Sequence, residues 1–192
     1  MQSSPVDQLL SRVSNPRLSE PSPSPEILDE VFRCALRAPD HMRLRPWRYL
    51  LVEGAHREFL GNLFETASIE ASMQRDETLS ETQREKLRKM PLRAPLIIVA
   101  ISKNLPHAKV PMHEQELSVG AGLSYMLLAL QSNGFGGIWR TGDMAENAHV
   151  KAGLGVQAQE RIVGFLYVGT PLGDPKKIEP LDPADFFKVW QP

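Results

Sequence analysis

Residues 113–142 of the chain read HEQELSVGAGLSYMLLALQSNGFGGIWRTG. No charged residue lies between Glu116 and Arg140, although 23% of all residues are charged. A helix that is apolar nearly all round is either buried or embedded in a membrane. The glycines and serines here leave too few apolar residues for a membrane span, which needs about 20. We therefore expect a buried central helix that ends at Gly134 as its C-cap, followed by a strand over Gly137–Arg140.

Length and composition bound the class of protein. The 192 residues fit a single domain, residues 1–192, that is large enough to bury a core. The formal net charge of −1 gives no sign of nucleic acid or an anionic membrane as a partner. The one cysteine, Cys34, excludes an internal disulfide and suits a reducing cytoplasm. Because the N-terminus also lacks the apolar core of a signal peptide, we expect a cytoplasmic protein with no membrane partner.

The other predicted elements are helices and short apolar strands. A helix over Val6–Val13 would turn its apolar side chains Leu9, Leu10 and Val13 inward. Ser24-Pro25-Glu26 begins a second helix, which runs to about residue 37. Further helices are expected over Ala55–Ser72, from the capping box Ser80…Gln83 onward, and near Glu146–Leu154. An apolar strand is expected over Tyr49–Glu53, and buried strands over Leu96–Ile101 and Arg161–Val168. Four strands interspersed with helices around one buried helix indicate an α+β sandwich.

Cations stand at the ends of several predicted elements. Arg12 and Arg17 flank small hydrogen-bonding residues, and such a cluster can hold a phosphate, with a solvated helix end as the alternative. Further cations are Arg37, His41 and Arg140. If these groups converge, they make a site for a phosphorylated, planar molecule, for which Trp47 and Trp139 could supply flat walls.

The motifs of several other chemistries are absent. The chain has no G-x-S-x-G elbow, no G-x-G-x-x-G after a strand and no P-loop. Its five histidines show no zinc-ligand spacing, so we expect no metal site. Residues 73–90 interleave acids with cations and lack aromatic side chains, which favours a solvated, lid-like helix over a nucleic-acid surface.

A series of motifs extends along almost the whole chain. They are L-L-x-R-x-S (9–14), R-L-x-E-P (17–21), R-A-P-D-H (37–41), P-W (46–47), R-A-P-L-I-I (93–98), K-V-P (109–111), E-Q-E (114–116), G-F-G-G-I-W-R (134–140) and I-V-G-F-L-Y-x-G-T-P (162–171). In this order they resemble the nitroreductase family of flavoproteins, and in particular its short YdjA-like branch of NAD(P)H nitroreductases. One such motif would be weak evidence, but this many in order are specific.

The resemblance implies a fold, an assembly and a set of site residues. The fold is an α+β nitroreductase-like sandwich with a central, mostly antiparallel sheet of four to five strands flanked by helices. The assembly is a domain-exchanged homodimer with FMN at the subunit interface. By matching position, the residues that bind FMN near its phosphate would be Arg12, Val13 and Ser14. FMN bound mainly by the other subunit would be contacted by Arg37 and His41. The flavin site would be completed by Trp139, Arg140 and Thr141. The segment matched to the nicotinamide nucleotide is Ala129, Leu130, Gln131, Ser132, Asn133 and Gly134.

The activity that the resemblance implies is that of an FMN-dependent NAD(P)H oxidoreductase. NADH or NADPH gives a hydride to FMN and leaves, and the flavin then reduces a nitroaromatic, quinone or related small-molecule acceptor, which is a ping-pong mechanism. The reaction takes place on the cofactor, so no side chain is expected to act as a nucleophile.

Two departures from the family pattern leave a second function open. Val13 stands where the family usually has a second arginine, and Arg43 and Arg45 stand where many relatives have Asn and Gln. Since those amides commonly contact the flavin, FMN affinity and redox poise do not follow from the resemblance. The alternative is a flavin-binding or interaction protein on the same fold with little or no turnover.

Overall fold

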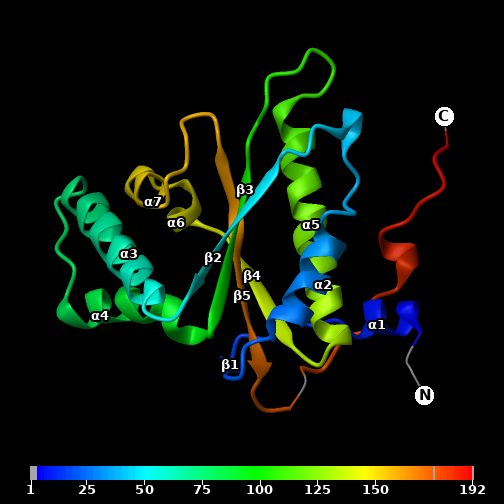
Figure 1. The fold of residues 1–192 in the computed structure, drawn as a ribbon, viewed down its shortest axis with the longest axis horizontal. Helices are drawn as coiled ribbons and strands as arrows, with labels where there is room; N and C mark the ends of the chain where they lie inside the picture. The colour runs from blue at the N-terminus through cyan, green and yellow to red at the C-terminus, as the bar shows by residue number, and fades with distance from the viewer. Residues whose placement is uncertain (1–3, 175, 192) are drawn as a thin grey trace.

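Five strands form one antiparallel sheet, and helices cover both of its faces (Figure 1). The computed structural model describes residues 4–174 and 176–191. The strand order is β1-β5-β3-β2, and β4 also pairs with β5. The strands are β1 (Leu18–Ser19), β2 (Trp47–Glu53), β3 (Leu96–Ser102), β4 (Gly136–Arg140) and β5 (Arg161–Pro171). The predicted α+β sandwich with a mostly antiparallel sheet is confirmed.

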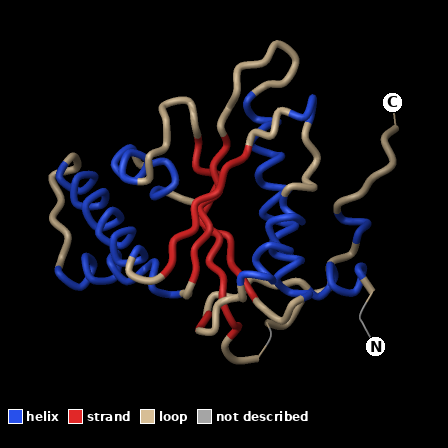
Figure 2. The backbone as a smooth tube through the Cα atoms, in the orientation of Figure 1, coloured by secondary structure: helices blue, strands red, loops and turns tan. Residues whose placement is uncertain are grey.

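The helices divide between the two faces, and Figure 2 shows the strands in red between them. One face carries α2 and α5 with α1 beside them, and the other carries α3, α4, α6 and α7. The helices are α1 (Pro5–Ser11), α2 (Pro25–Ala35), α3 (His56–Met73), α4 (Glu81–Lys89), α5 (Met112–Ser132), α6 (Asp143–Glu146) and α7 (Ala148–Gly153), and the 3-10 turns are η1 (His41–Arg43), η2 (Met90–Arg93) and η3 (Pro183–Asp185). Across the described ranges, no helix has the length and apolarity that a membrane crossing requires.

Helix α5 ends two residues before the predicted C-cap, Gly134. Asn133 is the cap residue, and Gly134 follows in the left-handed region at φ 79°. The N–H groups of Gly134 and Phe135 donate to the carbonyl oxygens of Gln131 and Leu130 at 3.0 and 2.9 Å, which is a Schellman ending. A glycine at this position avoids the steric cost of left-handed backbone, so the chain can turn directly into β4.

One face of α5 is buried and the opposite face is not. Val119, Leu123, Met126 and Leu130 are fully buried in the cluster that α5 forms with α2 and the sheet. Leu117, by contrast, is 69% exposed. The prediction of a helix buried all round is therefore wrong for the face that carries Leu117, because no described element covers that side chain.

The predicted inward orientation of the α1 leucines is also wrong. Leu9 and Leu10 are 58% and 71% exposed. Polar contacts hold α1 to the end of α5: Gln131 Nε2 donates to the carbonyl oxygen of Gln8 at 2.8 Å and to Ser11 Oγ at 3.1 Å. Because these contacts place the polar side of α1 against α5, the leucines face outward.

The second layer packs on the other face of the sheet. Phe64 of α3 meets Phe165 of β5 edge-on, with ring centroids 5.4 Å apart. The single helix expected near Glu146–Leu154 is instead the pair α6 and α7. Asn147 divides them, because its side-chain oxygen accepts the N–H groups of His149 and Val150 and so starts a new helix.

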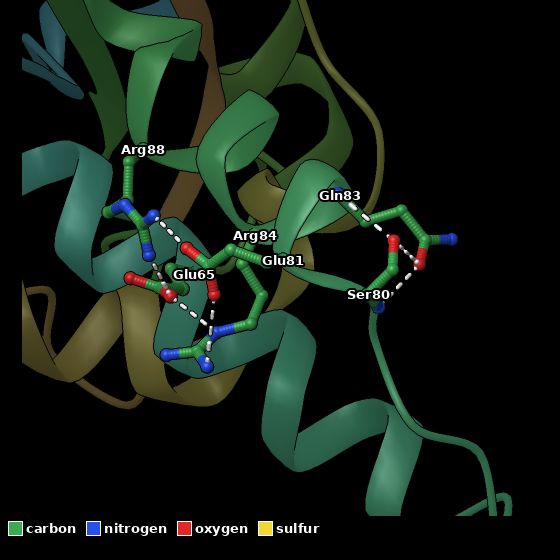
Figure 3. A network of polar contacts seen from close by, with 6 residues as sticks. All are labelled: Glu65, Ser80, Glu81, Gln83, Arg84 and Arg88. Carbon is green, nitrogen blue, oxygen red and sulfur yellow. Dashed lines mark hydrogen bonds and ion pairs between the residues drawn. The ribbon is translucent and has the colours of Figure 1, made fainter.

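A buried carboxylate connects α4 to α3. Glu65 of α3 is 9% exposed and accepts from Arg84 Nε at 2.7 Å and Arg88 Nη1 at 2.5 Å (Figure 3). The predicted capping box is confirmed, since Ser80 and Gln83 each accept the backbone N–H of the other. Two of the cations in this charged segment therefore hold two helices together.

At Gly61 the backbone of α4 approaches α3 so closely that a Cβ would lie 2.9 Å from the carbonyl carbon of Arg88 and would overlap its oxygen. Alanine normally favours a helix over glycine. Here we expect Gly61→Ala to lower the free energy of unfolding by about 1–3 kcal/mol, because it overpacks the contact. Chemical denaturation followed by circular dichroism measures this. Asn62→Ala, at an exposed neighbouring position, is the control and should not destabilise; an equally stable Gly61→Ala protein would contradict the close approach.

Candidate functional site

A cavity of about 420 Å³ lies beside the middle of α5, where the end of β4 meets the segment that follows α1. We call it the α5 cavity, and its lining residues are Arg12, Ser14, Ser124, Leu127, Trp139 and Thr141. Small-molecule sites usually measure about 300–1,000 Å³. The fold thus brings together four residues that the resemblance assigns to FMN, namely Arg12, Ser14, Trp139 and Thr141. Ser124 and Leu127 are additional to the sequence prediction.

Trp139 forms the flat wall of the α5 cavity, and two glycines make room for it. A Cβ on Gly120 of α5 would lie 3.2 Å from the indole Cη2, and a Cβ on Gly164 of β5 would overlap the indole ring. The indole Nε1 donates to the carbonyl oxygen of Val163 at 3.3 Å. The ring is therefore held between helix and sheet with its N–H satisfied, and its remaining surface can meet a ligand.

Arg140 points to the other face of the sheet, because successive side chains of a strand alternate. Its guanidinium carbon lies 5.5 Å from the centroid of the Tyr167 ring, a cation–π contact. Burial raises the pKa of the Tyr167 hydroxyl, and the charge of Arg140 opposes that rise. The Arg140 Nε is buried with no hydrogen-bond partner among the described residues. The structure therefore does not bring the Arg140 side chain into the α5 cavity.

The segment after α1 divides its side chains between two cavities. Arg12 and Ser14 line the α5 cavity, whereas Val13 lines a second cavity of about 420 Å³. This second cavity also includes Lys176 and Arg17, so the structure places Arg17 in a different cavity from Arg12, with which the sequence analysis grouped it. A side chain at position 13 therefore does not line the α5 cavity.

The segment matched to the nicotinamide nucleotide is mostly engaged in the fold. Ala129 and Leu130 are buried in the core, and Ser132 bonds to Gln8 of α1. Of its six residues, Gln131 and Gly134 line the second cavity. Gln131 already donates to α1, so it offers a ligand only its amide oxygen.

Arg37 and His41 lie away from the α5 cavity within one chain. His41 Nδ1 pairs with Glu114 Oε2 at 2.8 Å, at the first turn of α5. His41 lines a cavity of about 320 Å³ on the exposed side of α5, and Leu117 lines the same cavity. Arg37 is exposed at the end of α2. The structure therefore separates the group Arg37 and His41 from the group of four predicted FMN residues that lines the α5 cavity.

Gly142 is a further candidate that the motif comparison leaves out. It follows β4 with φ 96° and ψ −162°, a backbone region that essentially only glycine adopts. With Thr141 it lines a third cavity of about 470 Å³, and because Thr141 also lines the α5 cavity, the two adjoin there. A glycine directly after a strand and a polar pair is the sequence signal that points to such a turn.

The chain is similar to known proteins along most of its length. The family model described as "Nitroreductase family" matches residues 9–170. The chain is 40% identical over 182 residues to "Putative NAD(P)H nitroreductase YdjA" of Escherichia coli K12, which covers 94% of this chain and 96% of that protein.

Two solved structures show the same fold. A nitroreductase-like family protein from Bacillus cereus superposes with a TM-score of 0.82 at 21% identity, covering 98% of this chain and 97% of that one. Oxidized iodotyrosine deiodinase, bound to FMN and 3-iodo-L-tyrosine, superposes with a TM-score of 0.68 at 24% identity, covering 93% and 95%. The family model and the Escherichia coli relative together show that this chain belongs to the nitroreductase family.

Proposed function

We propose that the chain is an FMN-dependent oxidoreductase that uses NADH or NADPH to reduce nitroaromatic, quinone or related small-molecule acceptors in the cytoplasm, by a ping-pong mechanism. The observation that carries the proposal is the α5 cavity, which combines a guanidinium, three hydroxyl groups and an indole wall. The family, and the name of the Escherichia coli relative, support an oxidoreductase. The deiodinase structure, which contains FMN, supports the choice of cofactor.

The residues of the α5 cavity fit FMN. Arg12 and Ser14 adjoin one another and suit a phosphate, because a guanidinium forms paired, charge-assisted hydrogen bonds with it. The hydroxyls of Ser124 and Thr141 suit polar edges of the cofactor, and Trp139 offers a flat apolar surface to the ring. Val13 faces the second cavity, so the missing arginine at that position removes no side chain from this site.

Positioning is the main task of the protein in this proposal. The bound FMN would supply the hydride chemistry. The lining residues include no carboxylate, histidine, lysine or cysteine, so none is placed as a nucleophile or a general acid. Arg12 contributes a fixed positive charge, and the wedged indole of Trp139 restricts where a planar ring can lie.

A second copy of the chain would complete the site. Exposed apolar side chains belong to α5, α1 and the segment from η3 onward, and these elements lie on the same side of the sheet (Figure 1). These side chains are 58–88% exposed, and they are Leu9, Leu10, Leu117, Phe186, Phe187, Val189 and Trp190. Monomeric proteins rarely expose so much apolar surface on one side. We infer a homodimer in which this side is buried.

The symmetry of such a dimer joins the two groups of predicted FMN residues. A two-fold axis that lies in the interface and runs perpendicular to the α5 helix axis brings the exposed faces of the two α5 helices together and makes the helices antiparallel. The first turns of one α5, with His41 on Glu114, then face the later turns of the other, where Ser124 and Leu127 line the α5 cavity. Arg37 and His41 would thereby reach the FMN held by the partner subunit.

A flavin-binding protein with little turnover is the second candidate, and Arg43 and Arg45 are the features that favour it. Anaerobic reduction separates the two. We expect the FMN-loaded protein to lose its yellow colour on addition of NADH or NADPH and to regain it when a nitroaromatic or quinone is added. A protein that holds FMN but is bleached by neither nucleotide would support the second candidate. A colourless protein that takes up no FMN would contradict both.

The phosphate contact has its own test. Because a hydrogen bond to a charged group contributes about 1.5–3 kcal/mol, we expect Arg12→Ala to weaken FMN binding about 10- to 100-fold. Titration of the apoprotein with FMN, followed by flavin fluorescence, measures this. Arg33→Ala removes an exposed arginine of α2 that pairs with Asp29, and it should leave the affinity unchanged. Unaltered FMN affinity in Arg12→Ala would refute the contact.

The dimer is tested at Leu117. Since the two-fold axis places like charges close together, we expect Leu117→Glu to shift the protein from dimer to monomer in sedimentation velocity and to release FMN. Phe59→Glu, at a 64% exposed position of α3 on the other side of the sheet, should leave the dimer intact. A monomeric wild-type protein that still binds FMN would show the proposed interface to be wrong.

A further inference from the structure

The loop between α2 and β2 has an unusual backbone. Met42, Arg43 and Arg45 lie in the left-handed region with φ of 59°, 55° and 50°. Residues other than glycine reach this region at a cost in stability, and such outliers cluster at functional sites. Three of them within four positions mean that the surrounding structure imposes this loop shape.

Two carboxylates impose the shape. The side chain of Asp40 accepts the backbone N–H of Leu44 at 3.1 Å and that of Arg45 at 2.7 Å. Glu114 of α5 binds the His41 ring at 2.8 Å and so fixes the start of the loop to the central helix. Asp40 and Glu114 therefore bind the backbone and the His41 ring, and neither carboxylate pairs with Arg43 or Arg45.

The loop presents two guanidinium groups without partners. Arg43 and Arg45 are exposed, and neither side chain pairs with a carboxylate within residues 4–174 and 176–191. Several arginines on other elements are paired, since Arg33 binds Asp29 and Arg48 binds Glu160 through two nitrogens, whereas Arg12, Arg17, Arg37, Arg93 and Arg140 also form no ion pair among the described residues. A strained loop that is braced by acids, yet leaves both of its arginines unpaired, is suited to bind an oxyanion from outside the chain.

We propose that Arg43 and Arg45 bind an anionic group, a carboxylate or a phosphate, on the molecule that reacts at the flavin. The proposal rests on the function proposed above, because the two-fold arrangement that takes His41 to the α5 cavity of the partner subunit also takes this loop to its rim. An Asn and a Gln at these positions, as in many relatives, would offer hydrogen bonds without charge. This chain would therefore prefer anionic substrates.

The test compares a charged and a neutral acceptor of similar shape, 4-nitrobenzoate and 4-nitrobenzyl alcohol. Stopped-flow reoxidation of the reduced protein gives a rate with each acceptor. The measured quantity is the ratio of the rate with 4-nitrobenzoate to the rate with 4-nitrobenzyl alcohol. Comparing this ratio between variants cancels the intrinsic reactivity of the two acceptors. We use asparagine for the variants Arg43→Asn and Arg45→Asn because it tolerates left-handed backbone. We expect the ratio to fall about tenfold or more in the double variant, the range of a charge-assisted hydrogen bond. Arg33→Asn is the matched control and should keep the wild-type ratio.

The donor is examined in the same protein. NADH and NADPH differ in one ribose phosphate. A fall in the rate of flavin reduction that is confined to NADPH would therefore assign the two arginines to that phosphate. A loss confined to 4-nitrobenzoate would assign them to the acceptor. Either result supports the recognition of an anion. Unchanged ratios in both half-reactions of the double variant would overturn it.

A binding measurement keeps this inference separate from the enzymatic function. Calorimetry on the oxidised, FMN-loaded protein compares the affinity for 4-nitrobenzoate with that for the alcohol, and it needs no turnover. Charge-dependent binding that disappears in the double variant, in a protein that neither nucleotide reduces, would refute the oxidoreductase and uphold the anion site. Reduction by NADH and NADPH at relative rates that the double variant leaves unchanged, together with equal affinities for the two acceptors in wild type and variant, would uphold the oxidoreductase and refute the anion site.

Discussion

Helix α5 has two apolar faces, and the described chain covers only one of them. The inner face, with Val119, Leu123 and Met126, fills the space against α2 and the sheet. The outer face retains Leu117 in contact with solvent. Burial of apolar surface is the largest favourable contribution to folding and association, so we propose that a second copy of the chain covers the outer face. The α5 cavity lies along the same helix, and in our account the site and the interface are therefore one structure.

The geometry of β4 determines which side chains reach that site. In a strand, neighbouring side chains face opposite sides, so Trp139 turns toward α5 and Arg140 toward Tyr167. The indole has room only because Gly120 and Gly164 carry no side chain. The next turn begins at Gly142 in a conformation reserved for glycine. A short strand, two small residues beside it and one special turn thus set the wall of the cavity.

Much of the fold can be predicted from the sequence because its signals are local. Continuous apolar runs give the strands to within a few residues, and the capping box at Ser80 and the glycine after α5 mark helix ends. The family follows from an ordered set of motifs. The outward leucines of α1 could not be predicted in this way, because polar contacts with Gln131 decide their orientation.

The site is less accessible to sequence reasoning than the fold. A linear motif assigns residues that are adjacent in sequence, such as Arg12, Val13 and Ser14, to one ligand. In the structure Val13 lines a different cavity from Arg12 and Ser14. Leu130 fits the nicotinamide segment by position, yet it is fully buried in the core. The left-handed loop that carries Arg43 and Arg45 has no signature of its own, since neither residue is one that favours such a backbone.

A crystal structure of the protein grown with FMN tests the central claim most directly. We predict two copies related by a two-fold axis across α5, with the FMN phosphate on Arg12 and Ser14, its ring against Trp139, and His41 of the partner subunit beside it. FMN bound entirely within one chain, or in a place other than the α5 cavity, would contradict the account.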